Sequence, residues 1–200
     1  MRRRVESWRT RTVSILATCV LVILVLDASG PLAAGAAAGR VTALAVAPQD
    51  GTLWVGTAQG LFKSGDLGQT LAAVAVPATR VPADVTAVVV DPREPRAMYV
   101  AVAGDGVFKS QDGGRSWAAI NSGLDGLDVR GLAVSPTDGR LHAQVLGKGL
   151  YRSFAGRGWA RVDNGPAGTL HTLVSVNLST GMGGIFLYAA TDQGLVRGPD

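Results

Sequence analysis

Cysteine is almost absent from this chain of 200 residues, since Cys19 is the only one. Cys19 lies in the N-terminal apolar run, so the rest of the chain has no thiol. That excludes a disulfide, a thiol nucleophile and a cysteine-based zinc site there. Histidine is nearly as scarce, with only His142 and His171, whose spacing is not that of a metal-binding motif. We therefore expect no metal and no cofactor.

Glutamate is also scarce, because Glu94 is the only one beyond residue 39. Glycosidases typically need two carboxylates that face each other across a sugar, so such an enzyme would have to use aspartates here. Residues 40–200 carry 14 Lys and Arg against 13 Asp and Glu. This near balance gives no basic patch of the kind that binds nucleic acid.

The first 39 residues differ in composition from the rest. Arg2, Arg3 and Arg4 begin a basic stretch, an uncharged run of 14 residues follows from Val13 to Leu26, and an Ala-rich stretch comes next. This is the order of a secretory signal peptide, and the run is shorter than the roughly 20 residues of a spanning helix. We expect export to an extracytoplasmic location with a cleaved signal. The alternative is an uncleaved anchor, which would be the only membrane contact.

Beyond residue 40 the chain repeats. Val41–Pro48 matches Val85–Pro92 and Val129–Pro136, and more loosely a segment starting at His171, with offsets of 44, 44 and 42 residues. Each unit consists of short β-rich runs separated by Gly- and Pro-rich turns, with the period of a four-stranded propeller blade. The sequence predicts an all-β propeller, or part of one, of about four blades. Their ranges are 41–84, 85–128, 129–170 and an incomplete 171–200.

An eight-residue turn pattern, S-x-D-x-G-x-T/S-W, stands between the third and fourth runs. It is complete at Ser110–Trp117, ends in Leu instead of Trp at Ser64–Leu71, and is shortened at Ser153–Trp159. We expect the Asp to accept backbone N–H bonds, the Gly to adopt a conformation that other residues resist, and the Trp to begin the outer strand between blades. The residues assigned to these structural turns are Ser110, Asp112, Gly114, Ser116, Trp117, Ser64, Asp66, Gly68, Thr70 and Trp159.

These units resemble the Asp-box (BNR) repeats of sialidases, sortilin-type receptors and the photosystem II assembly-factor family. The stretch Asp91–Val100 also resembles the D-P-x-x-P-x-x-x-Y stretch of sortilin-like repeats. The resemblance implies that the Asp boxes lie on the face opposite the usual ligand site. Because the motif occurs in hydrolases, receptors and assembly factors, it indicates the fold and not the function.

The opposite face of such a propeller is formed by the loops before the inner strands and by the turns between second and third strands. Binding residues commonly lie on loops of this kind, and the mixed charges here suit a protein or glycan ligand. The candidate binding rim consists of Arg80, Asp84, Asp105, Asn121, Asp125, Asp128, Arg130, Lys148, Asn164, His171, Asp192 and Gln193.

No catalytic residue is assigned. Tyr99 and Tyr188 share a repeat position with Trp54, and Tyr151 shares one with two phenylalanines, so we interpret the tyrosines as packing residues. His142 is expected to be a half-buried strand residue. Arg80 and Arg130 are the only arginines expected near the rim, against the three that the resemblance to sialidases would imply.

The sequence therefore favours an exported, non-enzymatic binding or assembly scaffold. The alternative is the N-terminal part of an Asp-box glycoside hydrolase, sialidase-like or xyloglucanase-like. Because Val196–Asp200 aligns with Phe62–Asp66, Asp200 would take the Asp-box position of an unfinished blade. We expect a longer propeller to follow. Pairing of two copies and a four-bladed closure are the other possibilities.

Overall fold

The structure is a computed structural model that describes residues 39–154, 157–163, 165, 170–178 and 184–199. Within these residues all regular secondary structure is β, in four antiparallel sheets whose strands follow chain order. Three sheets have four strands and the last has three. Blade 1 contains β1 (Val41–Val46), β2 (Leu53–Thr57), β3 (Gly60–Ser64) and β4 (Ala72–Val74); blade 2 contains β5 (Val85–Val90), β6 (Met98–Val102), β7 (Gly106–Ser110) and β8 (Ala118–Ala119); blade 3 contains β9 (Val129–Val134), β10 (Arg140–Val145), β11 (Gly149–Phe154) and β12 (Trp159–Arg161); blade 4 contains β13 (Leu170–Leu178), β14 (Gly184–Thr191) and β15 (Gly194–Pro199).

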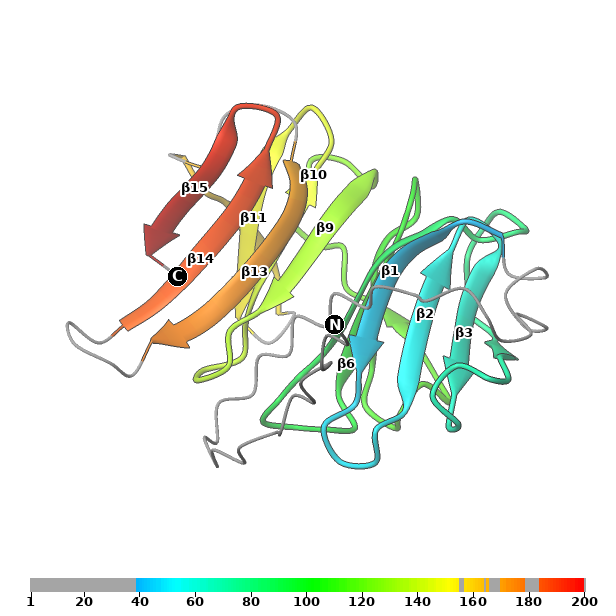
Figure 1. Cartoon of the computed structure of the whole chain (residues 1–200). Helices are drawn as coiled ribbons and strands as arrows, with labels where there is room; N and C mark the ends of the chain where they lie inside the picture. Colours follow the sequence, from blue (N-terminus) through cyan, green and yellow to red (C-terminus); the bar gives the residue numbers. More distant parts are fainter. Residues whose placement is uncertain (1–38, 155–156, 164, 166–169, 179–183, 200) are drawn as a thin grey trace, which may run out of the picture.

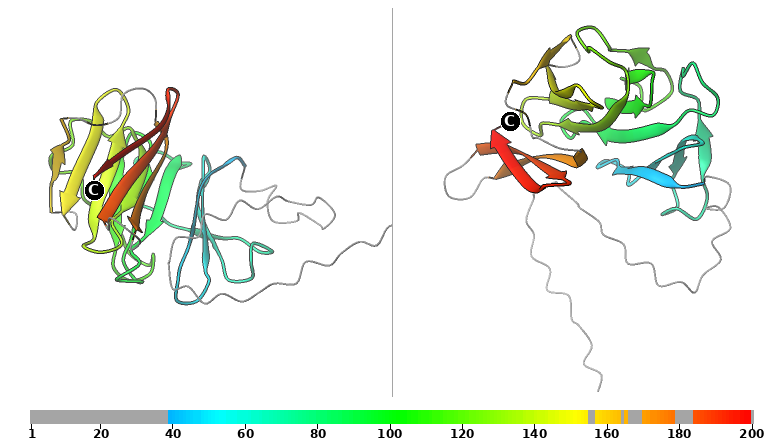
Figure 2. Two further views of the ribbon diagram at one scale, coloured as in Figure 1. Left: turned by 60° about the vertical axis from the view of Figure 1, so that its left-hand side comes forward. Right: turned by 90° about the horizontal axis from the view of Figure 1, so that it is seen from above.

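The four sheets follow one another around a common centre, with β1, β5, β9 and β13 innermost (Figures 1 and 2). The predicted all-β propeller of about four blades is confirmed. Adjacent inner strands pack on each other in chain order, β1 on β5, β5 on β9 and β9 on β13. The blades therefore follow one another as a series.

Apolar cores fill the space between successive blades. Trp54 and Leu61 of blade 1 pack with Val88 and Phe108 of blade 2. Tyr99 and Val107 of blade 2 pack in the same way with blade 3, and Leu150 of blade 3 packs with blade 4. The strands alternate, so each middle blade buries one face on the blade before it and the other on the blade after it.

The inner strand of each blade has an irregularity at its second residue. Pairing with the second strand shifts between Val41 and Ala43, between Val85 and Ala87, and in the corresponding places of blades 3 and 4. Such bulges turn a side chain out of the regular alternation. The four residues at the bulges are Thr42, Thr86, Arg130 and His171.

Blade 4 starts one residue earlier than the sequence comparison predicted. Leu170 pairs with Thr191, and Thr172 with Ala190, so Leu170 takes the place of Val129 and His171 takes that of Arg130. A slip of one residue exchanges the two faces of a strand. Leu173 consequently packs towards blade 3, the position that the sequence alignment gave to its neighbour.

Two further expectations are corrected. Trp117 does not begin the outer strand: β8 starts at the next residue, and the half-buried Trp117 packs against the core between blades 1 and 2. His142 is fully buried on β10, not half-buried, because blade 4 covers that face of blade 3.

Candidate functional site

The Asp-box turn of blade 2 is held by its aspartate. The Asp112 carboxylate accepts bonds from the Ser116 hydroxyl at 2.5 Å, the Ser116 N–H at 2.9 Å and the Ser110 hydroxyl at 2.8 Å. Gly114 N–H donates to the Ser110 oxygen at 2.8 Å. The Ser116 hydroxyl, together with the other donors, holds the pKa of Asp112 well below its usual range. Both carboxylate oxygens of Asp112 thus accept hydrogen bonds from within the turn.

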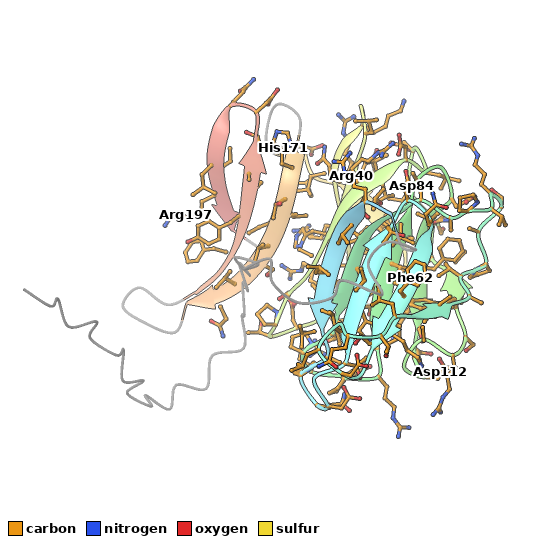
Figure 3. All side chains as sticks on the ribbon, turned by 45° about the vertical axis from the view of Figure 1, so that its right-hand side comes forward. Arg40, Phe62, Asp84, Asp112, His171 and Arg197 are labelled. Carbon is orange, nitrogen blue, oxygen red and sulfur yellow. The ribbon has the colours of Figure 1, made fainter. Side chains whose placement is uncertain are left out.

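Blade 1 repeats this arrangement. The Thr70 hydroxyl donates to Asp66 at 2.6 Å, and with the Ser64 hydroxyl it lowers the pKa of Asp66 to about 2. Figure 3 places Asp112 at the opposite end of the sheets from Asp84 and His171. The two Asp-box turns therefore lie away from the candidate binding rim.

The inner strands of all four blades line a central channel with a volume of about 430 Å³. Its walls are mostly apolar. The four bulge residues, Thr42, Thr86, Arg130 and His171, are among the lining residues, and they stand near the start of each inner strand. They form one polar ring, which we call the channel mouth.

Two of these four residues connect neighbouring blades. The Thr42 hydroxyl donates to the Val85 carbonyl, and the Thr86 hydroxyl donates to the Val129 carbonyl at 2.6 Å. Arg130 and His171 take the same position in blades 3 and 4, where they are exposed. At this position, blades 1 and 2 thus have a hydroxyl that bonds to the next blade, whereas blades 3 and 4 have an exposed guanidinium and an exposed imidazole.

Asp128 fixes the direction of the Arg130 side chain. Arg130 Nε lies 2.7 Å from Asp128 Oδ1, and Nη2 donates to Oδ2 at 3.0 Å. This two-point contact orients the planar guanidinium. About 40% of the Arg130 side chain stays exposed, so a ligand can reach it from the channel mouth.

Three residues expected on the open rim instead hydrogen-bond to other parts of the protein. Asp105 is buried, and its carboxylate accepts bonds from the N–H and the hydroxyl of Thr79 in the segment between blades 1 and 2. The Asn121 amide donates to the Asp105 carbonyl and accepts from the Val107 N–H. The segment that connects two blades covers Asp105 in the β6–β7 turn, which the sequence pattern did not reveal.

Asp125 connects blades 2 and 3. Its carboxylate accepts the Tyr151 hydroxyl at 2.8 Å. Burial, with the hydrogen bond to Asp125, raises the pKa of Tyr151 above its ordinary value. Tyr151 is therefore a neutral packing residue with a fixed donor.

The remaining rim residues are dispersed. Asp84 is half-buried just before β5, and its carbonyl accepts the Ala103 N–H. Arg80 is exposed in the segment before β5, Lys148 in the β10–β11 turn, and Asp192 with Gln193 in the β14–β15 turn. Asn164 lies outside the described residues. Of the described rim residues, Arg130 and His171 line the channel.

The sequence interpretation missed a second cleft, at the Asp-box end between blades 1 and 2. Its volume is about 500 Å³, and Lys63, Arg96, Arg115 and Asp50 contribute charged side chains to its walls. These residues come from separate turns and strands of two blades, so no local motif marks them. The one sequence feature that pointed towards this cleft is the basic residue that recurs on each third strand, such as Lys63.

Within the described ranges, no three His, Cys, Asp or Glu side chains gather closely enough to hold a metal ion. In the same part of the chain there is no helix that is long and apolar enough to cross a membrane.

No family model matches the chain, and no curated protein matches it. Solved propeller structures do resemble it. A GH74 xyloglucanase from Xanthomonas campestris is 19% identical with a TM-score of 0.54, over 78% of this chain and 30% of the enzyme. A nutrient-binding protein from Bacteroides thetaiotaomicron is 12% identical with a TM-score of 0.60, over 80% of this chain and 38% of that protein.

YCF48, solved with a bound D1 peptide, is 15% identical with a TM-score of 0.50, over 79% of this chain and 48% of YCF48. The chain thus spans less than half the length of each of these three proteins. At these identities the comparisons show the fold alone: the chain has the architecture of a β-propeller.

Proposed function

We propose that this protein is a non-enzymatic binding scaffold whose ligand occupies the channel mouth between Arg130 and His171. One observation carries the proposal. The bulge position that ties blades together through Thr42 and Thr86 holds an exposed Arg130 and an exposed His171 in the other two blades. Polar groups on rigid strand ends around a cavity are a common form of recognition site.

The chemistry of the channel mouth suits a polar ligand with an anionic or carbonyl group. Arg130 offers donors in a fixed direction, and His171 can donate or accept. The channel volume of about 430 Å³ falls within the range of small-ligand sites. A protein segment or a glycan end fits this description, in keeping with a peptide-bound YCF48 and a nutrient-binding protein among the similar folds.

The alternative function is a glycoside hydrolase, which the likeness to GH74 xyloglucanases keeps open. The state of the carboxylates favours binding instead. Asp105, Asp125 and Asp128 accept bonds from Thr79, Tyr151 and Arg130 respectively. Carboxylates held in this way are poorly placed to exchange protons with a sugar.

The binding proposal can be tested with oligosaccharide and random-peptide arrays probed by the labelled full-length protein. Signals that are lost in both Arg130→Ala and His171→Ala, and kept in Arg115→Ala, support it. Arg115 is a matched control because it is an exposed arginine on an Asp-box turn, where its N–H donates to Asp112. Binding that is unchanged in both channel variants would contradict the proposed site.

We also propose that the protein acts outside the cytoplasm. The support is the order of basic, apolar and Ala-rich segments in residues 1–39, of which 1–38 lie outside the described part. The extracellular domain of a putative hybrid two-component system from B. thetaiotaomicron has a similar fold and is compatible with this location.

A further inference from the structure

The cleft between blades 1 and 2, which we call the Asp-box cleft, has positive charge on both of its walls. Blade 1 contributes Lys63, near the end of β3, and blade 2 contributes Arg96, in the turn before β6, and Arg115, in the Asp-box turn. All three residues are exposed. The Arg96 carbonyl accepts the Gly113 N–H at 3.0 Å, so the turn that carries Arg96 is fixed against the Asp-box turn.

No carboxylate of the described residues pairs with these three cations, none of which forms an ion pair there. The two aspartates that line the cleft are instead engaged in their own turns. Asp50 accepts the Thr52 N–H at 2.9 Å, which lowers the pKa of Asp50, and Asp112 accepts the Ser116 N–H and hydroxyl. The cationic groups are therefore available to an anion that enters the cleft.

The next joint of the series shows what can fill such a place. Arg93, in the β5–β6 turn of blade 2, lies so close to the β9–β10 turn of blade 3 that a Cβ added to Gly139 would come within 2.5 Å of Arg93 Nη1. Blade 1 has the shorter, neutral Gln49 in place of Arg93, and blade 2 has Arg96 in place of Gly139. Between blades 1 and 2 no arginine of the preceding blade thus fills the space beside this turn.

The lysines of the two joints differ in the same sense. Lys109 has the repeat position of Lys63, but it is half-buried, and its ammonium lies over the Tyr99 ring at 5.7 Å. Lys63 is exposed at the cleft. The two joints therefore use equivalent basic residues differently: blade 2 packs its lysine on its own aromatic ring, whereas blade 1 presents its lysine to the Asp-box cleft.

We propose that the Asp-box cleft binds a small ligand with at least two anionic groups, carboxylate or phosphate, held between Lys63 of blade 1 and Arg96 of blade 2. A guanidinium matches the planar geometry of these groups with two parallel hydrogen bonds, and an ammonium adds a point charge. The cleft volume of about 500 Å³ falls within the range of small-ligand sites.

This site is separate from the channel mouth. Asp112, which lines the Asp-box cleft, lies at the opposite end of the sheets from His171 (Figure 3). Both sites can therefore be occupied at once. Because the two cations belong to different blades, a ligand that contacts both also bridges blades 1 and 2, whereas a ligand with one anionic group reaches only one of them.

The test is isothermal titration calorimetry of the full-length protein at low ionic strength with citrate, pyrophosphate and acetate. We expect one citrate or one pyrophosphate to bind per chain, and the tighter of the two identifies the anionic group that the cleft prefers. Acetate should bind far more weakly. Lys63→Gln and Arg96→Gln should each weaken binding by about tenfold, since each removes a charged hydrogen-bond donor.

Lys109→Gln is the matched control, because it removes the same charge from the equivalent position of blade 2, outside the Asp-box cleft. This variant should bind as tightly as the wild type. Three results would overturn the proposal: no binding of either polyanion, unchanged binding in both cleft variants, or an equal loss in Lys109→Gln, which would indicate an effect of net charge alone. A loss confined to Arg130→Ala would place the anion at the channel mouth and would also overturn it. Circular dichroism would establish that each variant is folded.

Discussion

Gly114 packs closely against the indole of Trp54, where the Asp-box turn of blade 2 meets the second strand of blade 1. A Cβ added to Gly114 would come within 2.5 Å of Trp54 Cη2. The glycine also has a φ of +78°. It therefore meets two requirements at once, a left-handed turn and close approach of the preceding blade.

Gly113 and Gly114 should consequently respond differently to alanine. Gly113 has a φ of +71°, and an added Cβ would meet nothing within 4 Å. Gly113→Ala should cost only the left-handed conformation, about 1 kcal/mol. Gly114→Ala should cost roughly 1–3 kcal/mol more through overpacking against Trp54. Urea unfolding would measure both, and equal losses would contradict the close packing.

Replacing Leu67 by glycine should stabilise the protein. Leu67 takes the place of Gly113 in the blade 1 turn, with a φ of 60° and 90% exposure. Relief of the left-handed strain outweighs the added freedom of the unfolded chain, for a net gain of roughly 0.5–1 kcal/mol. Leu67→Ala, which keeps the strain, should show no such gain. A Leu67→Gly protein with a lower midpoint of thermal unfolding would refute this.

The Asp-box turn should make stability depend on pH. The folded pKa of Asp112 lies below the ordinary value of 3.8, so its contribution is present above that pH and is lost as the pH falls towards the folded pKa. Asp112→Ala should lower the thermal midpoint at pH 7, and the gap to wild type should narrow below pH 3.8. Midpoints recorded from neutral to acidic pH would show this. A gap that stays constant would mean that the charge does not hold the turn.

Processing of the N-terminal segment is a separate prediction. After expression in a bacterial host, N-terminal sequencing of the exported protein should start between about Gly35 and Val41, as the signal-like order of residues indicates. A protein that keeps Met1 and stays in the cytoplasm would show that this segment is not an export signal.

The protein should not hydrolyse aryl sialosides or aryl glucosides. The carboxylates of Asp105 and Asp125 are occupied by hydrogen bonds, and Asp128 pairs with Arg130. Release of the aryl group would be followed by absorbance. Turnover that disappears in Asp84→Asn or Asp128→Asn would support the hydrolase alternative.

The repeat made the fold predictable, because the spacing of Val41, Val85 and Val129 and the Asp-box pattern are local in sequence. The register of blade 4 was less predictable: Leu173 and Val174 put an apolar side chain on each face of the strand, so only pairing with β14 distinguishes the two faces. The mouth position of Arg130 followed from its place near the start of an inner strand. Burial of Asp105 did not, because Thr79 reaches it from 26 residues away.

Arg130 stands where blades 1 and 2 have a threonine, so the joint between blades 3 and 4 is built differently from the other two joints. Among the described residues, the core between blades 3 and 4 has five buried members, against eleven and nine in the other two joints. This joint also lacks the hydroxyl tie that Thr42 and Thr86 provide. This joint separates Arg130 from His171, so the distance between these two side chains depends on how blades 3 and 4 pack. The proposed site at the channel mouth is therefore sensitive to substitutions in this core, at Leu150 or Leu173.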